Sequence, residues 1–161
     1  MNILSEFKNI KAIVMDVDGV LTNGSLILLD DGQMARTMNI KDGYALQLAV
    51  KMGYDIIIIS GAKGDSLAKR FLGLGIHNFH LGIEDKWTLF QQLNIDKSAT
   101  LYMGDDMPDL RVMKEVLIAA APADACKEIK DIAKYISPFK GGEGCVRDVI
   151  EKVLYLNNQW C

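Results

Sequence analysis

The stretch AIVMDVDGVLT, residues 12–22, contains the first indication of both the fold and its chemistry. Its apolar first half is typical of a strand covered on both faces, as in the centre of a parallel sheet. Asp16 and Asp18 follow at the carboxyl end of that strand, where open α/β sheets bind their ligands. Side chains two residues apart on a strand point the same way, so the two carboxylates can converge. Carboxylates that close require a proton or a cation between them, and oxygen ligands favour a hard cation such as Mg²⁺.

Two other interpretations apply to the same segment. Asp and Gly are ordinary turn residues, so a plain turn after the strand stays open from this segment alone. A calcium-binding EF-hand loop is excluded, because the fifth and twelfth positions counted from Asp16 are Val20 and Ile27, which offer no side-chain oxygen.

The composition is that of one soluble globular domain, expected to span residues 1–161. Apolar residues make up 50% of the chain, and the net charge of −3 is spread without a basic cluster, which argues against nucleic acid as a partner. The apolar runs are too short to cross a bilayer, so no membrane association is expected. Cys126, Cys145 and Cys161 are an odd number without metal-ligand spacing, which favours reduced thiols and a cytoplasmic location.

Strand-like runs alternate with helical patterns along the chain, which is the signature of βαβ units. The expected strands are residues 11–17, 56–60, 79–81, 100–103 and 117–120, with a short edge strand at 135–136. Apolar residues recur at the helical period between the strands and again over residues 146–154. These patterns predict a single Rossmann-like three-layer α/β/α domain with a mainly parallel sheet.

One segment interrupts this alternation. Residues 26–29 and 33–38 flank the turn Asp30-Asp31-Gly32, which predicts a β-hairpin inserted after the first strand at about residues 24–38. Because the hairpin follows the Asp16 strand directly, it should project from the same edge of the sheet as the candidate site. It is expected to be either a small lid or an oligomer contact.

Polar residues suited to one site follow the later strands as well. Ser60-Gly61 ends the second strand, where a hydroxyl and backbone N–H groups can hold a phosphate; an N-capping serine is the alternative. Lys86 begins a helix, where a cation is disfavoured unless an anion lies nearby; a solvated surface lysine is the alternative. The segment GDDMPD, residues 104–109, follows the fourth strand with three carboxylates. A carboxylate pair, a hydroxyl, a lysine and a metal site are the parts that phosphoryl transfer needs.

These four segments resemble the four motifs of the haloacid dehalogenase superfamily of phosphatases. The resemblance implies that Asp16 forms an aspartyl-phosphate and that Asp18 protonates the leaving group and later activates water. It implies that Ser60, Gly61 and Lys86 bind the phosphoryl group. It also implies that Mg²⁺ is held by the side chains of Asp16 and Asp105 and the backbone carbonyl of Asp18. Asp106 and Asp109 are expected around these ligands, orienting them or replacing them.

The short spacings between motifs leave no room for a cap domain, and the chain resembles the small capless branch of the superfamily. In that branch the hairpin helps to build a homotetramer and a neighbouring subunit closes the site. Residues 41–44 and 141–148 further resemble the 3-deoxy-D-manno-octulosonate 8-phosphate phosphatases, which supply a sugar of lipopolysaccharide. By that resemblance Lys41, Asp42 and Arg147 are candidates for binding the substrate, Arg147 through a carboxylate.

Ala62 departs from the resemblance. At that position the octulosonate enzymes often carry arginine, and the related nonulosonate 9-phosphate phosphatases carry an acidic residue. The expected substrate is therefore a small sugar-acid phosphate with eight or nine carbons. Two hypotheses from other classes are a phosphorylated receiver domain of signalling proteins and a non-catalytic assembly module. Intact Asp16 and Asp18 argue against the module, and Asp55, at the wrong end of its strand, argues against the receiver.

Overall fold

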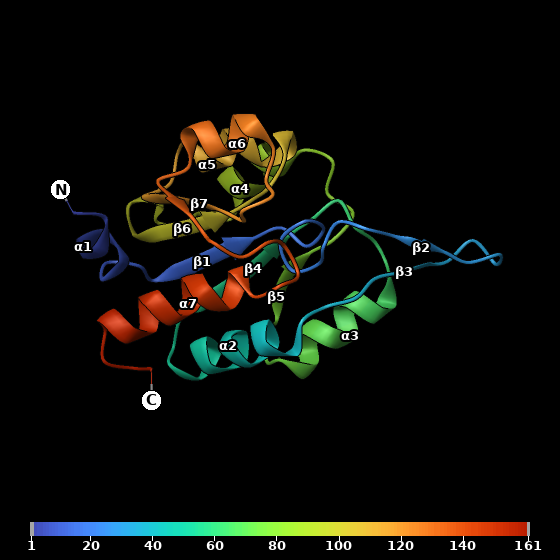
Figure 1. Ribbon diagram of the computed structural model, residues 1–161, viewed down its shortest axis with the longest axis horizontal. Coiled ribbons are helices and arrows are strands. Elements are labelled where there is room, and N and C mark those ends of the chain that lie inside the picture. The colour runs from blue at the N-terminus through green and yellow to red at the C-terminus, as the bar shows by residue number, and fades with distance from the viewer. Residues whose placement is uncertain (1, 161) are drawn as a thin grey trace.

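The computed structural model describes residues 2–160, and a six-stranded parallel sheet runs through its centre (Figure 1). The strand order is β5-β4-β1-β6-β7-β8, and every pairing in it is parallel. The strands are β1 (Ala12–Met15), β4 (Asp55–Ile59), β5 (Asn78–His80), β6 (Thr100–Met103), β7 (Ile118–Ala121) and β8 (Tyr135–Ile136). The expected parallel sheet, including the short edge strand, is confirmed.

Helices cover both faces of the sheet. They are α1 (Ile3–Phe7), α2 (Ile40–Lys51), α3 (Asp65–Gly73), α4 (Lys86–Gln92), α5 (Leu110–Met113), α6 (Lys127–Ile132) and α7 (Cys145–Leu156), with 3₁₀ turns η1 (Lys97–Ala99) and η2 (Met107–Asp109). In Figure 1, α2, α3 and α7 lie on one side of the sheet and α4, α5 and α6 on the other. Among the residues described, no helix is long and apolar enough to span a membrane.

The apolar core is divided by the sheet into two clusters. Ile13 and Met15 of β1 pack with residues of α2 and α7, whereas Val14 packs on the opposite face with Phe90 of α4. Successive side chains of a strand point to opposite faces, so a strand buried on both sides reads as one apolar run. The predicted three-layer α/β/α domain is therefore confirmed, with β1 at its centre.

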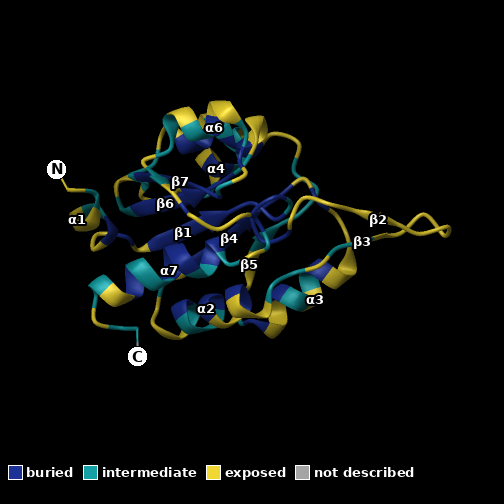
Figure 2. Cartoon of the chain, viewed as in Figure 1, coloured by how far each residue is buried: buried dark blue, intermediate teal, exposed yellow. Residues whose placement is uncertain are grey.

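The hairpin forms where the sequence pattern predicts it and projects away from the body (Figure 1). Its strands β2 (Ile27–Leu28) and β3 (Met34–Ala35) pair only with each other, in antiparallel register. Gly32 closes the turn with φ +83°, a conformation that glycine adopts without steric cost. Figure 2 shows that the arm is almost entirely exposed. Its paired strands are shorter than the apolar pattern suggested, because no other element covers them.

Candidate active site

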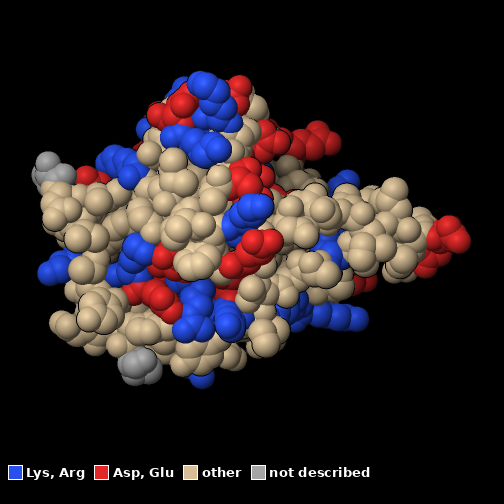
Figure 3. Space-filling view, in the orientation of Figure 1, with Lys and Arg blue, Asp and Glu red and all other residues tan. Residues whose placement is uncertain are grey.

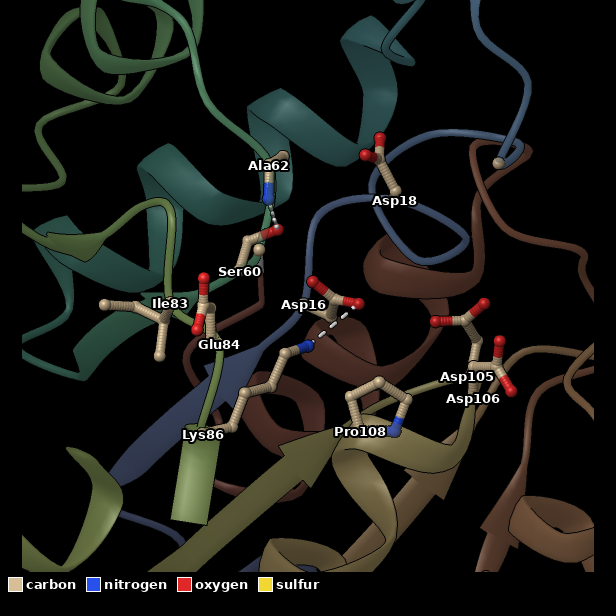
Figure 4. A pocket seen from close by; sticks show the side chains of 12 residues that line it. Asp16, Asp18, Ser60, Ala62, Ile83, Glu84, Lys86, Asp105, Asp106 and Pro108 are labelled. Atoms are coloured by element: carbon tan, nitrogen blue, oxygen red, sulfur yellow. Dashed lines mark hydrogen bonds and ion pairs between the residues drawn. The ribbon is translucent and has the colours of Figure 1, made fainter. Parts of the chain in front are cut away.

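The site residues meet at the carboxyl edge of the sheet, where β1, β4 and β6 end (Figure 4). They surround a pocket of about 390 Å³. Its lining consists of Asp16, Asp18, Gly24, Ser60, Gly61, Ala62, Ile83, Glu84, Lys86, Asp105, Asp106 and Pro108. The five residues predicted in the first three motifs therefore all line one cavity.

The turn after β1 sets the position of the two aspartates. The carbonyl of Val17 accepts hydrogen bonds from the N–H groups of Val20, Leu21 and Thr22, which curls the chain directly behind Asp16. Gly19 has φ +88° within this turn, and a Cβ there would collide with the Asp105 carboxylate. The glycine therefore lets the backbone next to Asp18 approach the fourth-motif carboxylate closely.

Lys86 is the charged centre of the pocket and is only 4% exposed. Its Nζ lies 3.0 Å from Asp16 Oδ2 and 2.7 Å from Asp109 Oδ1. Burial alone lowers the pKa of Lys86, but the Asp109 and Asp16 carboxylates outweigh it and raise that pKa above its usual value. The alternative of a solvated surface lysine is therefore wrong, and the side chain stays cationic beside Asp16.

The carboxyl groups of Asp16 and Asp105 ionise less readily than usual, because they are buried beside other acidic groups. Burial, with repulsion from Asp109, raises the pKa of Asp16 to about 6. Burial, with repulsion from Asp16 and Asp109, raises the pKa of Asp105 to about 7. Acid side chains that resist ionisation at a shared edge are typical of sites completed by a cation.

The geometry of these carboxylates suits a metal ion. Oxygens of Asp16, Asp105 and Asp109 lie within 4.8 Å of one another. Asp105 Oδ1 is buried and has no hydrogen-bond partner in the protein. Buried polar atoms are rarely left unpaired, and an all-oxygen donor set fits a hard divalent cation such as Mg²⁺. The residues present therefore fit the expected metal.

Asp109 and Asp106 play different parts in this edge. Asp109 is fully buried; its Oδ1 accepts from Lys86 Nζ and, at 2.7 Å, from Tyr102 OH. Its Oδ2 accepts from the N–H of Asp105 at 3.1 Å, so it orients that residue. Asp106 caps η2 by accepting from the N–H of Met107. Asp109 thus contacts Lys86 and the backbone of Asp105, and Asp106 lines the pocket beside them.

Ser60 is 1% exposed and its Oγ accepts from the N–H of Ala62 at 3.1 Å (Figure 4). The next helix, α3, begins five residues later, with Gly64 at its N-cap. Ser60 is therefore not an N-capping serine, and that alternative is wrong. Ser60 and Gly61 both line the pocket, so a hydroxyl and a backbone N–H are available there to a ligand.

Lys41, Asp42 and Arg147 are not brought to this pocket within one chain. Lys41 and Arg147 line a second hollow of about 690 Å³ between the start of α2 and the start of α7. Arg147 Nε donates to Glu151 at 2.6 Å, and its guanidinium lies 5.2 Å from the Trp160 ring. Asp42 is 1% exposed, and its Oδ1 accepts from the N–H of Arg147 at 2.8 Å. Within the chain, Asp42 therefore caps α7.

One feature of the site, the contact of Arg36, was missed at the sequence level, and a second, the approach of the glycine-rich segment near residue 141, was expected only from the family resemblance. Arg36, at the base of the hairpin, contacts both carboxylate oxygens of Asp18. The segment Gly141-Gly142 packs on the turn after β1, residues 16–22 (the catalytic turn), where Gly142 donates to the Val20 carbonyl at 3.0 Å. Neither contact follows a local pattern, since each joins segments whose distance in space depends on the finished fold. The glycine pair itself was the one available signal, because adjacent glycines often mark a close backbone approach.

Comparison with known proteins gives a consistent result. Residues 87–149 match the family of haloacid dehalogenase-like hydrolases. The 3-deoxy-D-manno-octulosonate 8-phosphate phosphatase KdsC of Escherichia coli (strain K12) is 31% identical over 157 residues, which are 95% of this chain and 84% of that protein. The Yersinia pestis phosphatase structure of the same name has a TM-score of 0.92 at 31% identity, covering 97% of this chain and 86% of that one.

A further structure adds ligands to the comparison. The phosphatase of this name from Moraxella catarrhalis was solved with a magnesium ion, a phosphate ion and a KDO molecule. Its TM-score against this chain is 0.91 at 33% identity, and the match covers 98% of this chain and 93% of that one. The chain therefore belongs to the haloacid dehalogenase-like hydrolases and, within them, to the family of the 3-deoxy-D-manno-octulosonate 8-phosphate phosphatases.

Proposed function

We propose that this protein is a Mg²⁺-dependent phosphatase that releases phosphate from 3-deoxy-D-manno-octulosonate 8-phosphate, with Asp16 as nucleophile. The observation that carries the proposal is Lys86 Nζ, 3.0 Å from Asp16 Oδ2 in a pocket shared with Ser60, Asp18 and Asp105. Relatives over nearly the whole chain have this activity by name. Membership in a hydrolase family also argues against the receiver domain and the assembly module.

The proposed reaction divides into two displacements. In the first, an Asp16 carboxylate oxygen attacks phosphorus, the bond from phosphorus to the sugar oxygen breaks, and Asp18 gives that oxygen a proton. In the second, Asp18 takes a proton from water, whose oxygen attacks the aspartyl-phosphate and restores the Asp16 carboxylate. Lys86 keeps Asp16 ionised and, together with Ser60 and the Gly61 N–H, is placed to neutralise the transferring phosphoryl oxygens.

A Mg²⁺ ion would be held by Asp16, Asp105 and the backbone carbonyl of Asp18, and it would supply positive charge against the phosphoryl group. The unpartnered Asp105 oxygen and the raised pKa values of Asp16 and Asp105 support this assignment. Asp109 would hold Lys86 and Asp105 in place around it. The same ion is present in the Moraxella catarrhalis complex.

Asp16→Asn tests the proposed nucleophile. Phosphate release from the octulosonate 8-phosphate should fall to background, while far-UV circular dichroism and the unfolding midpoint stay close to those of the unchanged protein. EDTA should abolish the activity of the unchanged protein, and added Mg²⁺ should restore it. Full turnover by the Asp16→Asn variant would contradict the assignment of Asp16, and full turnover in EDTA would contradict the metal requirement.

A panel of eight- and nine-carbon sugar-acid phosphates tests the substrate. Ala62 offers no cation for a carboxylate and no acid for an amine, so nothing at that position separates the two sizes. We expect the octulosonate ester to have the higher kcat/KM, as the relatives' names indicate. A higher value for a nonulosonate 9-phosphate would assign the protein to the nonulosonate alternative instead.

We also propose a cytoplasmic homotetramer in which a neighbouring subunit closes the pocket. Leu28 on the hairpin is 75% exposed and Ile27 is 55% exposed, an unusual apolar surface for an isolated arm. Figure 3 shows that the arm carries few charges except for acidic residues near its end. Lys41 and Arg147 line the second hollow and not the chain's own pocket, and we propose that they act on a neighbour's substrate. Cys126 and Cys145 are free thiols, which supports a reducing compartment; Cys161 lies outside the described residues.

A further inference from the structure

A bifurcated hydrogen bond from Arg36 connects the hairpin to Asp18. Arg36 Nε donates to Asp18 Oδ1 at 2.8 Å and to Oδ2 at 3.1 Å. The Arg36 side chain is only 11% exposed, whereas that of Asp18 is 32% exposed at the rim of the pocket. A charge-assisted hydrogen bond, here one N–H shared between both carboxylate oxygens, sets the direction of the Asp18 side chain.

A second group, the hydroxyl of Thr22, also holds the Asp18 carboxylate. Thr22 Oγ1 donates to Asp18 Oδ1 at 3.2 Å and itself accepts from the N–H groups of Gly19 and Gly24. The hydroxyl is buried and belongs to the same turn as Asp18. Arg36 is thus the one partner of the Asp18 side chain, among the contacts described, that comes from outside the catalytic turn.

The result is a separation of the pocket's carboxylates into two groups. Oxygens of Asp16, Asp105 and Asp109 gather within 4.8 Å of one another, and the side chain of Asp18 is not among them. Figure 4 shows the Asp18 carboxylate turned away from that of Asp16, although the two residues are neighbours on the turn. A free carboxylate two residues from a cation site would be drawn toward the cation. The contact with Arg36 opposes that attraction.

We propose that Arg36 is a positioning residue that holds the Asp18 carboxyl group outside the metal cluster and at the place where the leaving oxygen departs. This inference rests on the proposed role of Asp18 as proton donor. The hairpin would then contribute to catalysis through its base as well as to assembly through its exposed apolar surface. Arg36 would touch neither the phosphoryl group nor the metal.

The choice of leaving group tests this role. A sugar alkoxide needs a proton to depart, whereas p-nitrophenolate is a stable anion and departs without one. The experiment measures kcat/KM with Mg²⁺ for the octulosonate 8-phosphate and for p-nitrophenyl phosphate, because kcat/KM reports on the first displacement. The proteins are the unchanged chain, Arg36→Met, Arg36→Lys and Asp18→Asn. Arg111→Met is the matched control, since Arg111 lies over the Trp87 ring, outside the pocket lining.

We expect Arg36→Met to lose roughly 10–100-fold more kcat/KM on the sugar phosphate than on the aryl phosphate, which is less than the full, roughly 10²–10⁴-fold factor that general acid catalysis contributes. Arg36→Lys, which keeps one charged contact, should recover part of this difference, and Arg111→Met should show none. Equal losses on both substrates, or none, would overturn the proposal, because a merely structural role does not distinguish leaving groups.

Asp18→Asn separates this inference from the function on which it rests. A selective loss on the sugar phosphate in Asp18→Asn, without one in Arg36→Met, refutes the role of Arg36 alone. No selective loss in Asp18→Asn refutes the proposed proton donor and the positioning role together. Should Arg36→Met fail to fold, Arg36→Gln keeps one N–H donor at the hairpin base and carries the same expectation, with thermal unfolding as the check.

Discussion

Five of the twelve residues that line the pocket are acidic and one, Lys86, is basic. The fold holds these acidic side chains together against their mutual repulsion, which with burial raises the pKa values of Asp16 and Asp105. Such an arrangement weakens the folded state whenever both groups are ionised and no cation is bound. Lys86 relieves part of the repulsion, and Asp109 uses both of its oxygens to hold Lys86 and the backbone of Asp105.

Asp105→Asn should therefore stabilise the metal-free protein while destroying its activity. The raised pKa values mean that folded Asp16 and Asp105 hold protons up to about pH 6 and 7, whereas the unfolded chain releases them near the ordinary value of 3.8. The free energy of unfolding of the metal-free protein should consequently fall as pH rises from about 4 to 7. At pH 8 in EDTA the substitution should raise Tm by about 2–4 °C, corresponding to roughly 1 kcal/mol at this chain length.

Differential scanning calorimetry of both proteins from pH 5 to 8, with EDTA and with Mg²⁺, measures this effect. Added Mg²⁺ should raise the Tm of the unchanged protein more than that of Asp105→Asn, because ligand binding to the folded state stabilises it. A lower Tm for Asp105→Asn in EDTA at pH 8 would show that the Asp105 charge is not a source of strain.

The sequence predicts the residues of this site better than their contacts. Asp16, Ser60, Lys86 and Asp105 were found because each follows a strand, and parallel strands bring their carboxyl ends to one edge. Arg36 was not found, because the path of a hairpin arm relative to a turn is not encoded in a short pattern. Asp42 and Arg147 were assigned to substrate on resemblance. Inside one chain the Asp42 carboxylate instead accepts from the N–H of Arg147, a contact between residues 105 positions apart.

At the scale of elements, the loop that precedes α7 acts as a brace for the catalytic turn. Gly141 lies against the backbone of that turn, where a Cβ would collide with the carbonyl of Gly19 and come within 2.8 Å of the Thr22 oxygen. Gly142, with φ +70°, donates to the Val20 carbonyl. Two backbone segments this close leave no room for a Cβ atom, which explains why glycine occupies both positions.

Gly141→Ala should lower the free energy of unfolding by about 1–3 kcal/mol, the range for overpacking a tight contact, and should lower kcat by displacing the turn that carries Asp18. Gly73→Ala is the matched control, since Gly73 is in α3 with nothing within 4 Å of its Cβ position. Alanine there should leave kcat unchanged and raise stability by up to about 1 kcal/mol. Urea unfolding and phosphate release measure both effects. Equal behaviour of the two variants would contradict the brace.

At the scale of the whole molecule, the hairpin arm carries apolar surface that no other part of the described chain covers. The body buries its apolar residues in two clusters, one on each face of the sheet. The arm instead exposes apolar residues along both strands and at their ends, among them Leu26, Ile27, Leu28, Leu29 and Met34. Exposed apolar side chains gathered in this way favour contact with another copy of the chain.

Leu28→Asp should therefore reduce the size of the assembly in solution, because a carboxylate on each arm repels its neighbours and resists burial. Light scattering coupled to gel filtration should show a change from the proposed tetramer to smaller species, together with a higher KM if a neighbour closes the pocket. Leu72→Asp, at a 49% exposed leucine of α3, is the control and should leave the size unchanged. A tetramer with Leu28→Asp would contradict assembly through the arm.

The contact between Gly142 and the turn at Val20 also has a consequence for the time at which the enzyme becomes active during its synthesis. Ribosomes release the N-terminal part of a chain first. The reactive side chains of Asp16, Asp18, Lys86 and Asp105 emerge before the residue that braces their turn, since Gly142 follows all of them in the sequence. A nascent chain thus displays every reactive carboxylate without their final support. We expect truncated chains that end before Gly142 to release no phosphate in the assay used above, whereas the 161-residue chain does.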